Sequence, residues 1–211
     1  MINNILFVSF YTLDTEYQEV MYKYLVPSMD KFKLPYAIHG VHNKGSWLKN
    51  AAQKPTVLKE VFKADYNKHN GYILLDADAT IEKYPQLFYD IPLEYDMAVH
   101  YLDFAKWYQR EGAKKELLSG TLFIRNNIKT RRLINEWEEI SQRSDMWEQK
   151  VLQDLLVKHT DIKVYELPLE YAYIATRVDG SPPTIECDPV ISHHQVSRKL
   201  KKLINASNEK R

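Results

Sequence analysis

The fold prediction rests on the segment Gly71-Tyr72-Ile73-Leu74-Leu75-Asp76-Ala77-Asp78-Ala79-Thr80. A run of four apolar residues followed by two aspartates is typical of a strand that is buried on both faces and ends where the chain leaves the sheet. Ligands bind at that edge in open α/β sheets. Because side chains alternate along an extended chain, Asp76 and Asp78 are expected to project to the same side, where their oxygens suit one hard divalent cation.

Further apolar runs flank this segment and alternate with helical patterns. Strands are predicted within residues 5–10, 36–41, 72–75, 97–99 and 122–124. Helices are predicted after residue 15, from residue 55, near residue 127 and after residue 147. Strands that alternate with helices predict the α/β class, with a mostly parallel, Rossmann-like central sheet flanked by helices.

The first predicted helix carries two local signals. Thr15 and Gln18, three residues apart, have the form of a capping box. Pro27 is expected to kink or split the helix, because proline lacks the N–H and clashes with the carbonyl four residues earlier.

The composition bounds the class of protein. The 211 residues, 45% of them hydrophobic, suffice for one domain with a core. A net charge of +1 excludes a global field that would draw the chain to nucleic acid or to an anionic membrane. The single cysteine, Cys187, cannot form an internal disulfide, which is typical of a reducing compartment. Without a signal-peptide pattern or an apolar run near the ~20 residues that span a bilayer, the sequence predicts a soluble, cytoplasmic protein.

The chain shows no internal repeat or flexible linker. We therefore expect one domain over residues 1–197, followed by a basic tail over 198–211 with six basic residues and one acidic residue. The motifs G-x-G-x-x-G, C-x-x-C and G-x-S-x-G are absent, which disfavours a dinucleotide site, a structural zinc site and a serine hydrolase.

One interpretation of the aspartate segment is a phosphatase. Residues 76–80 match the D-x-D-x-T motif of haloacid-dehalogenase-like phosphatases, in which Asp76 would be the phosphorylated nucleophile. That motif normally lies on the first strand, whereas a β-α-β unit precedes it here, and the late acidic pair of that family is absent. The phosphatase remains an alternative.

The other interpretation is a sugar transferase. Together with segments around residues 10–12, 45–55, 118–124 and 191–199, the D-x-D sequence resembles the nucleotide-sugar-dependent glycosyltransferases of the GT-A type, particularly the glycogenin-like and galactosyltransferase-like branch. The resemblance covers nearly the whole chain. It implies a single GT-A domain in which Asp76 and Asp78 bind the Mn²⁺ or Mg²⁺ ion that holds the diphosphate of the donor.

The resemblance also implies donor-binding residues in the first third of the chain. Tyr11 and Thr12 stand where the family meets the base and ribose, and an aromatic ring can stack on uracil. Trp47 and Lys54 fall in the stretch where the family places a cation and a helix entry beside the donor. Lys54 either pairs with phosphate or is a solvated surface lysine.

Two later segments resemble the family's sugar-binding elements. Ser119 and Gly120 fall on a strand that passes under the donor sugar, where glycine permits close approach and hydroxyls offer hydrogen bonds. Glu148 and Gln149 stand where the family has Asp-Gln, so Glu148 departs from the pattern. These four are the candidate catalytic residues. The resemblance favours retention of anomeric configuration, and in an inverting enzyme Glu148 would be the base.

A segment near the end of the chain resembles the family's H-x-x-G-x-x-K element. His193 would complete the metal site, and Arg198, five positions on, would bind the diphosphate. Val196 stands where the family has glycine.

The sequence thus predicts a metal-dependent glycosyltransferase that moves a sugar from a nucleoside-diphosphate sugar, with UDP favoured, to an acceptor hydroxyl. The acceptor is a glycan, a protein or a modified nucleic acid, and residues 103–110 form either an acceptor loop or a surface helix. A nucleotide-sugar-binding module without catalytic activity is a further alternative.

Overall fold

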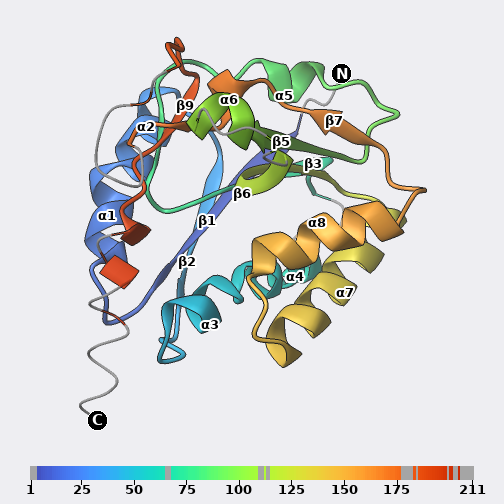
Figure 1. The fold of residues 1–211 in the computed structure, drawn as a ribbon, viewed down its shortest axis with the longest axis horizontal. Coiled ribbons are helices and arrows are strands. Elements are labelled where there is room, and N and C mark those ends of the chain that lie inside the picture. Colours follow the sequence, from blue (N-terminus) through green and yellow to red (C-terminus); the bar gives the residue numbers. More distant parts are fainter. Residues whose placement is uncertain are drawn as a thin grey trace.

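A six-stranded sheet forms the centre of the protein (Figure 1). The computed structural model describes residues 4–64, 68–108, 112, 115–176, 183, 185–198, 200–201 and 204. The strands, in spatial order, are β2 (Tyr36–Val41), β1 (Ile5–Thr12), β3 (Gly71–Leu75), β6 (Lys115–Arg125), β5 (Met97–Asp103) and β7 (Val164–Glu166).

Five of these strands run in one direction. β1 pairs in parallel with β2 and β3, and β5 pairs in parallel with β7. β6 is antiparallel to both of its neighbours, β3 and β5. The predicted mostly parallel α/β sheet is therefore confirmed, with one reversed strand at its centre.

Helices cover both faces of the sheet. They are α1 (Tyr17–Lys23), α2 (Leu25–Lys31), α3 (Trp47–Ala51), α4 (Lys54–Ala64), α5 (Leu87–Asp90), α6 (Phe104–Tyr108), α7 (Ile128–Arg143), α8 (Glu148–Lys158) and the 3-10 turn η1 (Leu169–Tyr171). Helices α4, α7 and α8 pack on one face around the fully buried Trp137. Helices α1, α2 and α5 pack on the other, around Met21, Leu25 and Phe88. In the described part of the chain, no helix is both long and apolar enough to cross a membrane.

The local helix signals had different outcomes. Asn127 caps α7 through a capping box with Thr130, in agreement with the predicted start. The predicted break near Pro27 is confirmed, since α1 and α2 separate at Tyr24. The predicted capping box at Thr15 is wrong, because this hydroxyl accepts from the Tyr17 N–H at 3.3 Å and donates to a carbonyl of the preceding turn.

A second, smaller sheet carries the C-terminal part of the chain to the D-x-D segment. It consists of β4 (Ala79–Ile81), β9 (Ile191–His193) and β8 (Tyr173–Ile174), with β9 in the middle. β9 is antiparallel to β4, and this register places His193 opposite Ala79. The residue after the aspartate motif thus lies beside a histidine more than a hundred positions later.

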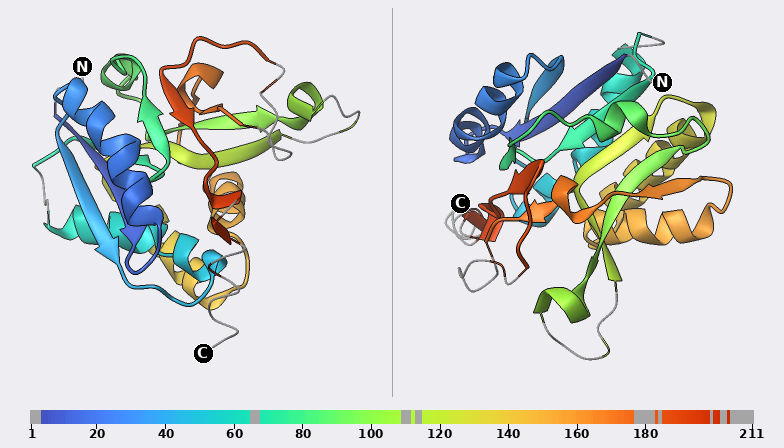
Figure 2. Two further views of the ribbon diagram at one scale, coloured as in Figure 1. Left: turned by 90° about the vertical axis from the view of Figure 1, so that its left-hand side faces the viewer. Right: turned by 90° about the horizontal axis from the view of Figure 1, so that it is seen from above.

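The pairing of β5 with β6 shifts register beside the same place. Val99 pairs with Leu122 but His100 pairs with Leu118, so residues 119–121 form a bulge on β6. Beyond the bulge, β6 has no pairing with β3, which ends at Leu75. The outer halves of β5 and β6 continue as a two-stranded ribbon that projects from the sheet, with α6 at its end (Figure 2).

The predicted tail lies largely outside the described residues. Within 198–211 the structure describes Arg198, Leu200, Lys201 and Ile204. Leu200 and Ile204 are buried against Val20 of α1. The boundary at residue 197 stays a prediction.

Candidate functional site

A cavity of about 410 Å³ opens at the edge of the sheet where β1 and β3 end. The bulge of β6, the first turns of α3, α4 and α8, and the end of β9 complete its wall. Every candidate residue from the sequence lines it: Tyr11, Thr12, Trp47, Lys54, Asp76, Asp78, Ser119, Gly120, Glu148, Gln149, His193 and Arg198. The residues come together as expected for one site, and their individual roles stay predictions.

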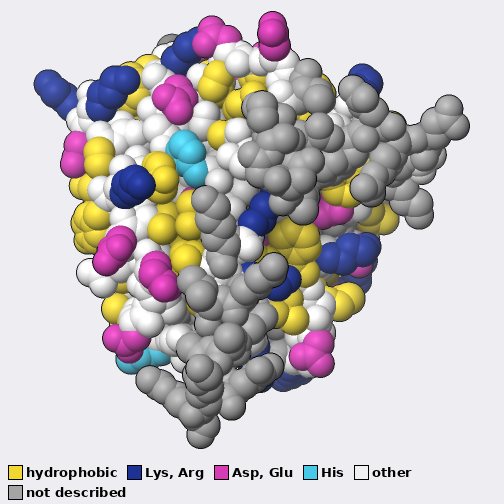
Figure 3. Space-filling model, turned by 60° about the vertical axis from the view of Figure 1, so that its left-hand side comes forward, with side chains coloured by type: hydrophobic (Ala, Val, Ile, Leu, Met, Phe, Trp, Pro, Cys, Tyr) yellow, Lys and Arg dark blue, Asp and Glu magenta, His cyan; other side chains and the backbone are white. Residues whose placement is uncertain are grey.

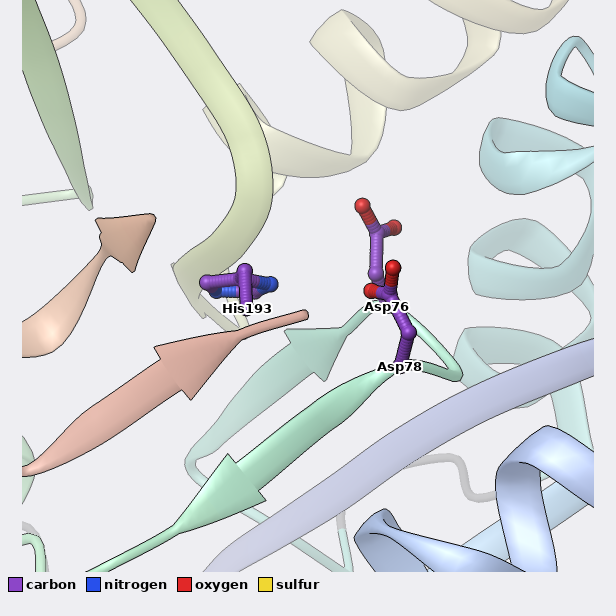
Figure 4. A group of neighbouring side chains, drawn as sticks. All are labelled: Asp76, Asp78 and His193. Atoms are coloured by element: carbon purple, nitrogen blue, oxygen red, sulfur yellow. The ribbon is translucent and has the colours of Figure 1, made fainter. Parts of the chain in front are cut away.

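Two carboxylates and an imidazole cluster in this cavity (Figure 4). Asp76 follows β3, Asp78 lies in the turn to β4, and His193 ends β9. One potential ligand atom from each residue lies within 4.8 Å of the others. The Asp76 N–H also donates to the Gly120 carbonyl at 2.9 Å, which fixes the turn against the bulge of β6.

Burial shapes the charges of this cluster. Burial, and after it the charge of Asp76, raises the pKa of Asp78 to about 7. Burial lowers the pKa of His193 to about 4, so this imidazole is neutral at pH 7. A neutral imidazole beside two aspartates is a donor set that suits a divalent metal ion.

The surroundings of His193 leave one ring nitrogen for such an ion. Its Nε2 lies 2.8 Å from the hydroxyl of Thr121. When Nε2 carries the proton and donates to Thr121, Nδ1 presents its lone pair toward the aspartates. A Cβ at Gly120 would lie 2.9 Å from His193 Cε1 and 3.1 Å from Asp76 Oδ2. Glycine at this position therefore keeps the space between the ligands open.

Lys54 is a buried cation rather than a solvated lysine. At the start of α4 it is 4% exposed, and its Nζ lies 2.9 Å from Asp76 Oδ1 and 3.1 Å from Glu148 Oε1. Its Nζ also donates to the Ser119 hydroxyl at 3.0 Å. Burial by itself would lower the pKa of Lys54, but the charges of Asp76 and Glu148 outweigh it and hold that pKa well above its usual range.

The first turn of α8 is tied to the bulge of β6. The Ser119 hydroxyl donates to Glu148 Oε1 at 2.9 Å, and the Ser119 N–H donates to Gln149 Oε1 at 3.0 Å. The Gln149 amide donates to Glu116 Oε1 at 2.6 Å. Glu148 is 1% exposed, and its Oε2 has no hydrogen-bond partner among the described residues. Trp137 of α7 donates to the Glu148 carbonyl at 2.8 Å and so fixes where α8 begins.

Aromatic rings and one arginine also line the cavity. The rings of Trp47 and Trp147 lie 5.9 Å apart, and the ammonium of Lys201 lies 4.5 Å from the Trp47 ring centre. Burial, and after it the charge of Asp78, raises the pKa of the Tyr17 phenol. The guanidinium of Arg198 donates to the Thr176 carbonyl at 2.8 Å, which orients it along the cavity wall.

Some lining residues escaped the sequence analysis. Glu116 precedes Leu118 and Gly120 at the period of a strand, so alternation along β6 would have pointed to it. Thr121, which follows the recognised Ser-Gly pair, does not line the cavity but holds His193 from behind. In the segment 103–110, residues Phe104–Tyr108 form helix α6, so this part of the segment is a helix rather than a loop. Phe104 of this helix lines the cavity. Residues 109–110 lie outside the described part of the chain.

Comparisons with known proteins agree with this geometry. A profile of the family described as nucleotide-diphospho-sugar transferase matches residues 2–203. No curated protein matches the sequence.

Two solved structures are similar in fold. A glycosyltransferase involved in the glycosylation of the major capsid of PBCV-1 superimposes with a TM-score of 0.64 at 10% identity, over 99% of this chain and 100% of that chain. The apo structure of the bifunctional glycosyltransferase WbbM gives a TM-score of 0.58 at 10% identity, over 92% of this chain and 46% of that chain. At such low identity the likeness shows the fold alone.

The family profile spans nearly the whole sequence. The fold that carries the aspartate-lined cavity is also that of the two similar glycosyltransferase structures. The chain therefore belongs to the nucleotide-diphospho-sugar transferase family and is a glycosyltransferase enzyme with a GT-A type of fold.

Proposed function

We propose that this enzyme binds a nucleoside-diphosphate sugar, with a UDP-sugar favoured, together with Mn²⁺ or Mg²⁺, and transfers the sugar to an acceptor hydroxyl. The observation that carries the proposal is the cluster of Asp76, Asp78 and His193 in the cavity, with ligand atoms within 4.8 Å of one another.

Asp76, Asp78 and His193 would hold the metal ion. Bound there, the ion would supply positive charge for the diphosphate as it leaves with the electron pair of the broken bond. The imidazole in the donor set favours Mn²⁺ over Mg²⁺, because Mg²⁺ prefers oxygen ligands alone. Gly120 supports this assignment, since any side chain there would fill the space between the ligands.

The nucleotide would occupy the side of the cavity that β1 and α3 form. Tyr11 offers an aromatic face to the base, and Thr12 at the end of β1 offers a hydroxyl for the ribose. Trp47 lines the same side. The guanidinium of Arg198 suits the diphosphate, because its fork can donate two hydrogen bonds to one phosphate. Lys54 would add positive charge to the site while it holds the carboxylate of Asp76.

The transferred sugar would lie over the bulge of β6. Ser119 donates to Gln149 Oε1 through its N–H, and both residues line the cavity and offer groups for sugar hydroxyls. Gly120 permits close approach of the sugar to the strand. The unpartnered Oε2 of the buried Glu148 supports a role close to the reacting centre. We expect retention of anomeric configuration, which proton NMR of the product tests.

Thermal stabilisation tests the donor site. The purified protein is heated with UDP, GDP, ADP and CDP, each with MnCl₂ and then with EDTA. A nucleoside diphosphate at about 100 times its Kd would stabilise the fold by about 2.7 kcal/mol. We expect the largest shift with UDP and Mn²⁺, no shift with EDTA, and no shift in Asp78→Ala.

The matched control is Asp154→Ala, which removes an exposed aspartate paired with Lys150 on α8. This variant should respond to UDP and Mn²⁺ as the wild type does. A protein that no nucleoside diphosphate stabilises, with metal or without, would contradict the proposal.

Turnover separates the transferase from the two alternatives. The enzyme should release UDP from a UDP-sugar and leave p-nitrophenyl phosphate intact. Phosphate release from p-nitrophenyl phosphate that is lost in Asp76→Asn would instead favour the phosphatase. Binding of UDP without release of UDP from any UDP-sugar would favour a module without catalytic activity.

A further inference from the structure

The cavity extends past the donor residues along the projecting ribbon of β5 and β6. Its wall there is apolar and consists of Leu102 from β5, Phe104 from α6, Leu118 from β6 and Ile174 from β8. One carboxylate, that of Glu116 on β6, lines the cavity among these side chains. This part of the cavity is not used by the proposed donor site.

Glu116 is held in place from one side only. Its Oε1 accepts a hydrogen bond from the Gln149 amide at 2.6 Å. The carbonyl end of the same Gln149 side chain accepts from the Ser119 N–H, which fixes the orientation of the amide. Among the described residues, no hydrogen bond or ion pair reaches Glu116 Oε2. The carboxylate therefore has one oxygen in use and one available to a ligand in the cavity.

The hydrogen-bond chain places this oxygen next to the proposed sugar site. Glu116 binds Gln149, and Gln149 binds Ser119 at the bulge where the donor sugar would lie. A pyranose whose hydroxyl donates to Glu116 Oε2 would thus lie beside the proposed donor sugar. Carboxylates are strong acceptors for such hydroxyls.

We propose that Glu116 and the apolar wall of Leu102, Phe104, Leu118 and Ile174 form the acceptor subsite, and that the acceptor is a pyranoside, whose hydroxyl binds Glu116. The inference rests on the proposed function and names its second substrate. In the transfer, the acceptor oxygen forms a bond to the anomeric carbon while the bond from that carbon to the diphosphate breaks. The hydroxyl proton passes to the leaving diphosphate oxygen, and Glu116 orients the hydroxyl without taking its proton.

The chemistry of this subsite favours a sugar over the other acceptor classes. A pyranose offers hydroxyl donors at its edge and C–H groups on its face, which match one carboxylate and an aliphatic and aromatic wall. A nucleic acid would bring phosphates toward the carboxylate of Glu116, which would repel them. Among the described side chains on the face shown in Figure 3, basic and acidic groups are interspersed. A peptide backbone would need several polar partners, and along this wall Glu116 supplies the charged or polar side chain.

The test measures release of UDP from UDP-sugars with and without simple acceptors. The acceptors are p-nitrophenyl and octyl hexopyranosides, whose aglycones can cover the apolar wall. In the wild type, at least one pyranoside should accelerate UDP release. Glu116→Gln keeps the shape and an oxygen for the Gln149 amide but removes the charge. This variant should raise the KM for the pyranoside at least tenfold, with a change in kcat below threefold.

Glu139→Gln is the matched control. Glu139 lies on the exposed surface of α7 and pairs with Arg143 there, so its replacement should leave both constants unchanged. If Glu116 only supported the position of Gln149, its replacement would lower kcat more than it raises the KM for the pyranoside. That result in Glu116→Gln would overturn the binding role.

The outcomes separate this inference from the proposed function. Absence of stabilisation by any nucleoside diphosphate would remove the donor site itself. With a working donor site, acceleration of UDP release by a serine-containing or tyrosine-containing peptide or by RNA, and by no pyranoside, would overturn the acceptor class. A KM that is unchanged in Glu116→Gln would overturn the assignment of Glu116, and no acceleration by any pyranoside would overturn the subsite.

Discussion

Replacing Gly120 by alanine tests whether the metal ligands need the space beside this residue. The added Cβ would lie 2.9 Å from His193 Cε1, about 0.5 Å inside the 3.4 Å at which ordinary van der Waals contact begins. It would also lie 3.1 Å from both Asp76 Oδ2 and His193 Nδ1. The neighbours of the methyl group are therefore the ligand atoms themselves, and His193 is 4% exposed with little room to retreat.

The expected cost falls on metal affinity. Metal–ligand distances tolerate about 0.2 Å, so a displacement of several tenths of an ångström exceeds what the site can absorb. Losses of 10-fold to 100-fold are usual when the orientation of ligands is disturbed, which corresponds to about 1.4–2.7 kcal/mol. We expect a loss of this size for Mn²⁺ in Gly120→Ala, measured by isothermal titration calorimetry.

Gly112→Ala serves as the control for the exchange of glycine for alanine. Gly112 is exposed, and a Cβ there meets nothing within 4 Å, although its φ of +69° makes alanine unfavourable. This variant should lose about 1 kcal/mol of stability and no Mn²⁺ affinity. Wild-type affinity for Mn²⁺ in a folded Gly120→Ala variant would refute the reasoning.

Two further predictions concern the charges of the site. Lys54→Met leaves the carboxylate of Glu148 buried without its cation, so the free energy of unfolding should fall by about 3–5 kcal/mol in urea denaturation; a change below 1 kcal/mol would show that the pair contributes little. The affinity for Mn²⁺ should fall about tenfold per pH unit below pH 7, because Asp78, with a pKa of about 7, must lose a proton to bind the ion, whereas His193 stays neutral down to about pH 4. An affinity that does not change between pH 7 and pH 5.5 in calorimetric titrations would contradict the second prediction.

Five of the six strands of the central sheet were predictable from local patterns, whereas the three-residue β7 was not predicted. Each predicted strand is a short apolar run, and such a run is typical of a strand buried on both faces. The helix near residue 127 was predictable for a similar reason, since the side chain that caps it stands at its own start. The capping box predicted at Thr15 does not form. Its hydroxyl instead donates to the carbonyl of Thr12, three residues earlier in the turn, which local patterns did not reveal.

Pairing between distant segments could not be predicted from local patterns. The reversed direction of β6 and its bulge depend on which strands become neighbours, and nothing in residues 115–125 alone specifies that choice. The burial of Lys54 could not be predicted for the same reason. Its sequence context is that of any lysine at a helix start, whereas its environment comes from Asp76, Glu148 and Ser119 on three other segments. Glu116 escaped prediction because its strand extends four residues before the recognised Ser-Gly pair.

The pairing of β9 with β4 has a consequence for the order of folding. Asp76 and Asp78 leave the ribosome long before His193, which follows them by more than a hundred positions. A nascent chain that has not yet exposed His193 therefore lacks one of the three ligands, and an occupied three-ligand site would require that β9 has already paired with β4. Ion binding would also strengthen the small sheet, because it would join β9 to the turn before β4.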